Sequence, residues 1–152
     1  MPDPDPPEPD RAGRVLGLDV GQARIGVAVS DDRRRLAVPI GTVRTGAPQD
    51  LKAVAALVRE HGATDVVIGL PLSLSGREGE AADHARAFAE ALRGFLQIPV
   101  HLQDERLTTV EAERALRRAG IGGRTRREVV DQTAATLILQ AWLDAGGRDR
   151  PV

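Results

Sequence analysis

The chain has 152 residues, with 21 basic and 22 acidic side chains and no cysteine. This length suits one domain that can bury a core without cross-links, and the lack of cysteine excludes a disulfide framework and a thiolate metal site. No apolar run approaches the roughly 20 residues of a membrane span, and the acidic, proline-rich start is unlike a secretory signal peptide. We therefore expect a cytoplasmic protein without a membrane partner.

The charges are distributed unevenly along the chain. Residues 1–10 hold four of the acids and no base, so the remaining body carries a net charge of about +3. A basic body is compatible with a nucleic-acid partner, although a charge this small is also common on domains that bind none. Aromatic residues are scarce, which disfavours the base-stacking platforms of single-strand-binding proteins.

The first predicted elements are three strands. Residues 1–12 are expected to be disordered, because proline and acidic residues bury little apolar surface. Residues 14–20, 24–30 and 36–43 are apolar runs with short connections, which predicts an antiparallel meander. The basic turn before the third strand, residues 33–35, is expected to be solvated.

The pattern then alternates between helix and strand. Apolar residues at helical spacing predict a helix that begins near Pro48 and stops at Gly62. Strands are predicted at 65–69 and 99–103, on either side of a helix over 76–95. Capping-box pairs support three helix starts, at Ser75 with Glu78, Thr108 with Glu111 and Thr125 with Glu128, and the last two helices are predicted over 108–120 and 125–145, joined by a glycine-rich loop.

This order of elements predicts one α/β domain over residues 13–146, followed by a frayed end at 147–152. Strand–helix–strand units connect parallel strands through right-handed crossovers. The three antiparallel strands and the parallel ones therefore form a mixed five-stranded sheet with helices on both faces.

Three carboxylates occupy positions where a solvated acid is not the obvious choice. Asp19 interrupts an apolar strand, on the side that it shares with Val15 and Gly17. Glu105 follows the fifth strand, where sites in α/β sheets collect, and Asp131 lies on the apolar face of the last helix. Each has an ordinary alternative: a turn aspartate, a solvated loop with a local ion pair, or a hydrogen bond to a buried group.

Together the three acids predict a metal site. Carboxylates held close together repel one another unless a cation neutralises them, and oxygen ligands without His or Cys suit Mg²⁺ or Mn²⁺. Two such ions roughly 3.5–4 Å apart can activate a water and stabilise the leaving oxygen in phosphodiester cleavage. A cation in front of Asp19 would explain an aspartate in a buried strand.

Four blocks of sequence carry a family resemblance. They are GLDVGQARIGVAVSD (17–31), VVIGLPLSLSGREG (66–79), QDERLTTVEAE (103–113) and VDQTAATLILQAWL (130–143). In this order they resemble the bacterial YqgF/RuvX family, pre-16S rRNA nucleases once called Holliday junction resolvases. The similarity covers nearly all of residues 14–145.

The resemblance implies a ribonuclease-H-like fold and a catalytic, metal-binding site made of Asp19, Glu105 and Asp131. It also implies a substrate of structured RNA, with the 5′ end of precursor 16S rRNA in ribosome biogenesis as the usual assignment. Many relatives in the wider superfamily carry an acid at the end of the fourth strand, where this chain has Gly69. Glu105 must then supply the second carboxylate from the neighbouring strand, and we expect one tightly held metal, with a second that arrives with substrate.

Arginines surround the predicted site. Arg24 and Arg106 flank it and are candidates to hold a phosphate or to brace a carboxylate. Arg124 and Arg126, beside the glycine loop, are candidates to follow a nucleic-acid backbone or to form a solvated helix face. The expected partners are precursor rRNA or branched DNA, within or outside a pre-ribosomal particle, and the protein is expected to be a monomer or a homodimer.

Three other functions stay open at this point. The same fold could act as a resolvase of four-way DNA junctions, or bind RNA in ribosome assembly without cutting it. The first block is also similar to the phosphate loop of actin-like ATPases and sugar kinases, which need two lobes around a nucleotide. His84 is expected on an exposed helix face, and His101 is given no role.

Overall fold

The structure, a computed structural model, describes residues 13–72, 78–105 and 123–147, and within the last helix the side chains from residue 133 onward. The predicted tail at 1–12, the predicted helix at 108–120 and residues 148–152 lie outside this described part. In the described part, no helix is long and apolar enough to cross a membrane.

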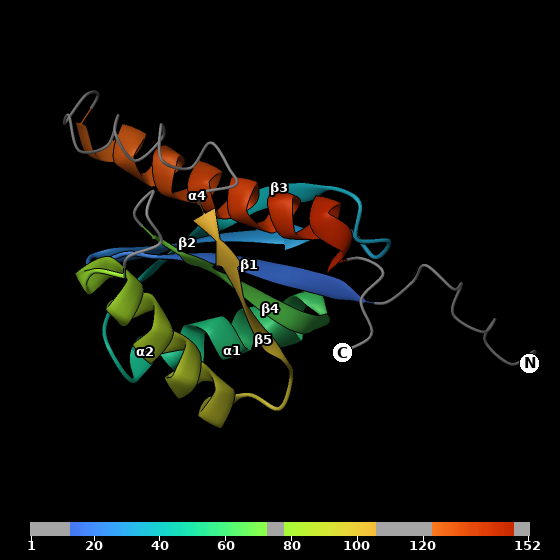
Figure 1. Cartoon of the computed structure of the whole chain (residues 1–152), viewed down its shortest axis with the longest axis horizontal. Helices are drawn as coiled ribbons and strands as arrows, with labels where there is room; N and C mark the ends of the chain where they lie inside the picture. The colour runs from blue at the N-terminus through green and yellow to red at the C-terminus, as the bar shows by residue number, and fades with distance from the viewer. Residues whose placement is uncertain (1–12, 73–77, 106–122, 148–152) are drawn as a thin grey trace, which may run out of the picture.

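The sheet has five strands in the order β3-β2-β1-β4-β5 (Figure 1). The first three strands form an antiparallel meander, while β4 lies parallel to β1 and to β5. This arrangement confirms the predicted mixed sheet. The strands are β1 (Arg14–Val20), β2 (Arg24–Ser30), β3 (Ala37–Arg44), β4 (Ala63–Leu70) and β5 (Val100–Asp104).

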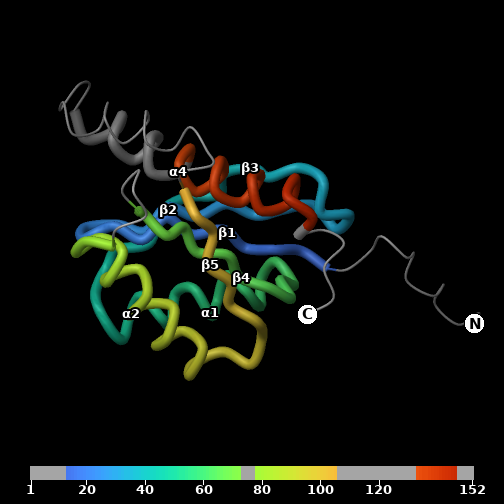
Figure 2. Tube along the Cα trace, viewed as in Figure 1, coloured from blue at the N-terminus to red at the C-terminus, as the bar shows by residue number. Residues whose placement is uncertain are grey.

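Helices cover both faces of the sheet, as predicted. One face carries α1 (Gln49–His61) and α2 (Glu80–Phe95), and the other is crossed by α4 (Gly123–Trp142), which continues into the π-helical turn η2 (Leu143–Gly147) (Figure 1). Figure 2 shows the red C-terminal helix lying over the blue strands with which the chain begins. The last helix therefore completes a core that the first strands start.

Strand alternation divides the buried side chains between two cores. Leu16 and Leu18 of β1 belong to the core beneath α1 and α2, whereas Val15 belongs to the core beneath α4. Each fully buried aliphatic side chain contributes about 1.5–3 kcal/mol to stability. A one-residue shift of β1 would exchange the two sets and place Asp19 in the wrong core.

Gly17 allows α4 to approach the sheet closely. A Cβ atom on Gly17 would lie 2.6 Å from Cβ of Leu139 and 3.2 Å from the carbonyl oxygen of Ala135. Real Cβ contacts are longer, because carbon atoms prefer separations of about 3.5–4.0 Å. The glycine therefore sets the distance between α4 and β1.

The ends of the helices agree with the predictions in part. Gly62 ends α1 in a left-handed conformation (φ 64°), as its position predicted, and Pro48 directly precedes the first helical residue. The predicted start of α2 is wrong: the helix begins at Glu80, and Glu78 pairs with Leu72 in an isolated β-bridge. The last helix begins at Gly123, within the predicted glycine loop.

Asp31 holds the turn between β2 and β3. Its Oδ1 accepts hydrogen bonds from the backbone N–H groups of Arg35 and Leu36, at 2.8 and 3.1 Å. Burial raises the pKa of Asp31, but these backbone hydrogen bonds outweigh that effect and hold the pKa below its ordinary value of 3.8.

The prediction that this basic turn is solvated is wrong for Arg34. Its neighbouring arginines are exposed, but Arg34 adopts a left-handed conformation (φ 57°) and its side chain is only 2% exposed. The guanidinium donates to the carbonyl of Gly13 at 2.8 Å and forms an ion pair with Asp65 at 2.5 Å. Nε2 of His101 lies 2.8 Å from the second oxygen of Asp65, so a buried polar network joins the turn to β4 and β5.

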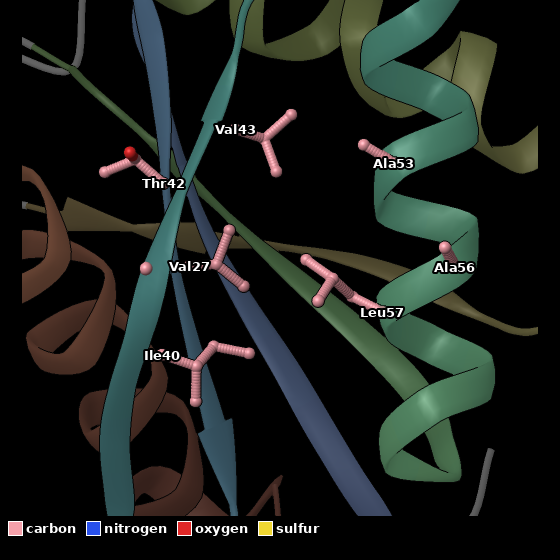
Figure 3. A pocket seen from close by; sticks show the side chains of 8 residues that line it. Val27, Ile40, Thr42, Val43, Ala53, Ala56 and Leu57 are labelled. Atoms are coloured by element: carbon pink, nitrogen blue, oxygen red, sulfur yellow. The ribbon is translucent and has the colours of Figure 1, made fainter.

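An apolar cavity of about 290 Å³ lies between the edge strand β3 and α1. Figure 3 shows Ile40 and Val43 pointing toward Ala53 and Leu57 of α1, while the side chain of Thr42 points away from the helix. The cavity is lined by no titratable side chain and lies on the sheet face opposite α4. It is therefore separate from the predicted acidic site.

Candidate active site

Asp19 and Glu105 lie at the same end of the sheet. Asp19 is the last residue but one of β1, and Glu105 directly follows the last residue of β5. β1, β4 and β5 run parallel, so their carboxyl ends meet at one edge, where α/β proteins commonly place their sites. Both acids are buried, with 2% and 4% of their surfaces exposed.

Both acids also belong to the sheet face that α4 covers. Gly17 lies against α4, so alternation along β1 places Asp19 on the same face. In β5, the ring of His101 packs on Trp142, with ring centroids 4.9 Å apart. Alternation from His101 then assigns Glu105 to this face too.

Glycine occupies the sheet positions on both sides of Asp19. Gly26 of β2 is its direct antiparallel partner. On the other side, Leu18 pairs with Ile68 of β4, so the next step of the parallel register places Gly69 beside Asp19. The two residues that flank Asp19 in the sheet therefore place no side chain beside its carboxylate.

The carboxylate of Glu105 lies over Gly69. A Cβ atom on Gly69 would lie 2.3 Å from Oε1 of Glu105 and 2.5 Å from Cδ1 of Ile138 in α4. Neighbouring strands are about 4.8 Å apart, so the Glu105 carboxylate lies roughly one strand spacing from Asp19. The fold thus brings an acid from β5 across β4 toward the acid of β1.

Asp131, the third predicted acid, lies in α4 in the turn before Ala135. Its side chain lies outside the described part, so only its backbone is placed. α4 runs antiparallel to β1 (Figure 1), and the carbonyl of Ala135 lies over Gly17. One helical turn advances about 5.4 Å and two strand residues about 6.6 Å. The backbone of residue 131 therefore reaches about the level of Asp19.

The donors at this edge suit a hard divalent cation. Asp19 and Glu105 offer carboxylate oxygens and no nitrogen or sulfur, which is the donor set that Mg²⁺ and Mn²⁺ prefer. Among the side chains that the structure describes, no group of three or more His, Cys, Asp and Glu gathers. A third acidic ligand would therefore come from a side chain outside the described ones, and Asp131 stays the predicted residue.

Arg24 lies on the face of the acids, at the start of β2. Alternation from Gly26 places it there, and its direct partner on β3 is Arg44. Like charges directly opposite each other destabilise a sheet, and a bound anion would reduce the repulsion between these two guanidinium groups. No local sequence pattern marks Arg44 as a site residue, because its register depends on a bulge in the β2–β3 pairing.

The other predicted arginines are not placed by their side chains. Arg106 lies outside the described residues. Arg124 and Arg126 lie at the start of α4, where only the backbone is described. His84 was expected to be exposed, but it is partly buried, and its Nε2 lies 3.4 Å from the carbonyl oxygen of Gly21 in the β1–β2 turn.

The fold and the buried acids define a class: an α/β protein of ribonuclease-H-like fold with acidic residues at the carboxyl ends of its parallel strands. A family model described as "RuvX: Holliday junction resolvase" matches residues 13–145. The chain belongs to this RuvX family, which confirms the resemblance seen in the sequence.

Individual relatives agree with this assignment. A Thermobifida fusca protein named "Putative pre-16S rRNA nuclease" is 53% identical over 148 residues, covering 92% of each chain. Proteins of the same name from Nocardia farcinica and Mycobacterium tuberculosis are 48% and 50% identical, covering 93% and 92% of this chain and 83% and 84% of theirs.

A solved structure shares the fold. It is titled "T. thermophilus RuvC in complex with Holliday junction substrate", and it matches with a TM-score of 0.51 at 15% identity, covering 92% of this chain and 99% of that chain. The family model and the named relatives place the chain in a nuclease and resolvase-like family, and the solved structure supports the fold.

Proposed function

We propose that this chain is a metal-dependent nuclease that hydrolyses phosphodiester bonds of structured RNA, and that it processes the 5′ end of precursor 16S rRNA. The observation that carries the proposal is the burial of Asp19 and Glu105 on one face, at the carboxyl ends of two parallel strands. The name that the relatives share supports this choice of RNA.

Asp19, Glu105 and Asp131 would hold Mg²⁺ or Mn²⁺ in this site. A divalent cation supplies positive charge that activates the attacking water and stabilises the leaving oxygen. The acids also need that cation to admit substrate, because bare carboxylates repel the phosphate backbone.

The protein contributes position and charge around the reacting phosphate. The strand ends fix Asp19 and Glu105, and the packing of α4 on β1 limits the access of bulk water. Arg24 and Arg44, at the same end of the sheet, would donate hydrogen bonds to non-bridging phosphate oxygens beside the cleaved bond. Cleavage would form a bond between phosphorus and the oxygen of water and break one P–O ester bond, and the leaving oxygen would take up a proton to become a hydroxyl group.

A cleavage assay on matched substrates tests this proposal. The substrates are a structured RNA with the precursor 16S 5′ extension, a single-stranded RNA and a four-way DNA junction, each with Mg²⁺, with Mn²⁺ and with chelator. The proteins are the wild type, Asp19→Asn and the control Asp32→Asn, which makes the same chemical change in an exposed side chain.

We expect the protein to cut the structured RNA only when metal is present. The cleavage rate should fall by a factor of about 100 or more in Asp19→Asn and stay unchanged in Asp32→Asn. RNA binding without cutting, unaffected by chelator, would identify a binding protein instead. The description of the family model supports a second candidate, a resolvase of four-way DNA junctions. Paired symmetric cuts in the junction, with the RNA left intact, would establish that activity.

A further inference from the structure

Gly69 lies in β4 at the centre of the proposed site, between the strands that carry its two described acids. A side chain at this position would point toward α4, because Ile138 of that helix lies above it. The space is not empty, however. Oε1 of Glu105 lies 2.3 Å from the place where a Cβ of residue 69 would be.

This distance excludes the simultaneous presence of a Cβ at residue 69 and the Glu105 carboxylate in its observed position. Even the smallest side chain would overlap it, since non-bonded carbon and oxygen atoms prefer separations well above 3 Å. The overlapping atoms are Oε1 of Glu105 and Cδ1 of Ile138. Both are ends of flexible side chains, so a Cβ would displace them and leave the backbone of β4 in place. The position of the Glu105 carboxylate thus depends on a glycine in another strand.

We infer that Gly69 is a positioning residue: its missing side chain creates the seat from which the carboxylate of Glu105 reaches across β4 toward Asp19. The inference rests on the proposed function, in which Glu105 holds a cation. The space over residue 69 of β4 therefore has room for one carboxylate, which belongs either to an acid at residue 69 itself or to Glu105.

A double-mutant cycle tests this role, with Mn²⁺ binding to the full chain measured by titration calorimetry. The four proteins are the wild type, Gly69→Ala, Glu105→Gln and the double variant. We expect Gly69→Ala to weaken Mn²⁺ binding about tenfold, which is typical when the orientation of a metal ligand is lost. In the Glu105→Gln background, the same glycine substitution should cause no further loss.

Two controls separate positioning from packing. Gly94→Ala alters a glycine that has no atom near its added Cβ and should leave Mn²⁺ affinity unchanged. Gly69→Ala combined with Ile138→Val removes the Cδ1 atom that the new methyl group would also contact. If Gly69 acts through Glu105, this variant should recover stability in thermal unfolding but retain the weakened Mn²⁺ binding.

The failures are distinguishable. A wild type that binds no Mn²⁺, or a Glu105→Gln variant that binds it normally, would overturn the proposed metal site. If Glu105→Gln loses Mn²⁺ while Gly69→Ala stays within twofold of the wild type, the metal site stands and the role of Gly69 is overturned. Equal losses from Gly69→Ala in both backgrounds would also overturn it, since the effect would then not pass through Glu105.

Discussion

Among the ion pairs that the structure describes, the pair of Asp65 and Arg34 should be the most sensitive to loss of one charge. Replacing Asp65 with asparagine should therefore destabilise the protein strongly. Asp65 and Arg34 form an ion pair whose side chains are 1% and 2% exposed. Asparagine keeps the shape of the side chain but removes its charge. The guanidinium of Arg34 would keep its bonds to Gly13 and Thr64 but would lose the buried negative charge of Asp65 beside it.

The size of this effect follows from the burial. Removing one partner of a buried ion pair typically lowers the free energy of unfolding by about 3–5 kcal/mol. Domains of this size have total stabilities of about 5–15 kcal/mol, and each kcal/mol lowers the melting temperature by roughly 2–4 °C. We therefore expect the Asp65→Asn variant to melt about 6–20 °C below the wild type.

Urea unfolding followed by Trp142 fluorescence, with thermal unfolding by circular dichroism, measures this loss. The matched control is Asp32→Asn, which breaks an exposed ion pair with Arg14 and should change stability by less than about 1 kcal/mol. Replacing both partners with apolar residues, as Arg34→Met and Asp65→Leu, should recover most of the loss, because the buried guanidinium is removed together with the carboxylate. A loss below about 1 kcal/mol in Asp65→Asn would refute the reasoning.

Three further predictions concern packing, pH and nucleic acid. Gly17→Ala should lower the free energy of unfolding by about 1–3 kcal/mol, because its methyl group would overlap Leu139 and push α4 from the sheet, whereas Gly94→Ala in α2 should be neutral or stabilising by up to about 1 kcal/mol. Asp31→Asn should be about 0.5–1 kcal/mol less stable than the wild type at pH 7. The pKa of Asp31 is lowered in the folded state, so this difference is present above its unfolded value and should close as the pH falls below about 4. Arg44→Ala should weaken RNA binding similarly for all sequences and reduce the salt slope by about one.

Each of these has a measurement that can contradict it. Chemical denaturation compares the two glycine variants, and equal stabilities would show that α4 does not depend on Gly17. For Asp31, unfolding across pH 2–8 should show the gap closing only in acid, and a gap independent of pH would exclude the carboxylate as its source. RNA binding by fluorescence anisotropy at several salt concentrations tests Arg44, with Arg59→Ala on α1 as the control. An equal change of slope in both variants would mean that Arg44 is not specific to the site.

Moving the carboxylate from residue 105 to residue 69 tests whether Mn²⁺ binding can be restored. The Glu105→Ala variant vacates the space over Gly69 and should lose Mn²⁺ binding. Adding Gly69→Asp places an acid on β4 in the same volume, and should recover part of the affinity. Calorimetry measures both variants, and a double variant that binds Mn²⁺ no better than Glu105→Ala would contradict the geometry.

Much of the fold is determined by local patterns in the sequence. Short, nearly continuous apolar runs predicted the strands, helical spacing predicted α1 and α2, and Gly62 ended a helix as its conformational freedom predicted. Asp19 was singled out because an acid inside an apolar strand is unusual, and Glu105 because sites in α/β sheets collect at the ends of strands. These features depend on near neighbours in the chain, so a single sequence contains them.

Other features depend on contacts that no local pattern encodes. Arg34 was predicted to be solvated because it lies in a run of arginines, but its counterion, Asp65, is 31 residues away, and only the pairing of β4 beside β1 brings the two together. The same holds for the site. The sequence identified Glu105 at the end of β5 and a glycine, Gly69, where many relatives in the wider superfamily carry an acid on β4. Whether the Glu105 carboxylate lies over Gly69 depends on the strand register and on how closely α4 packs on the sheet. Those are properties of the packed sheet, since close packing allows only one group in that volume.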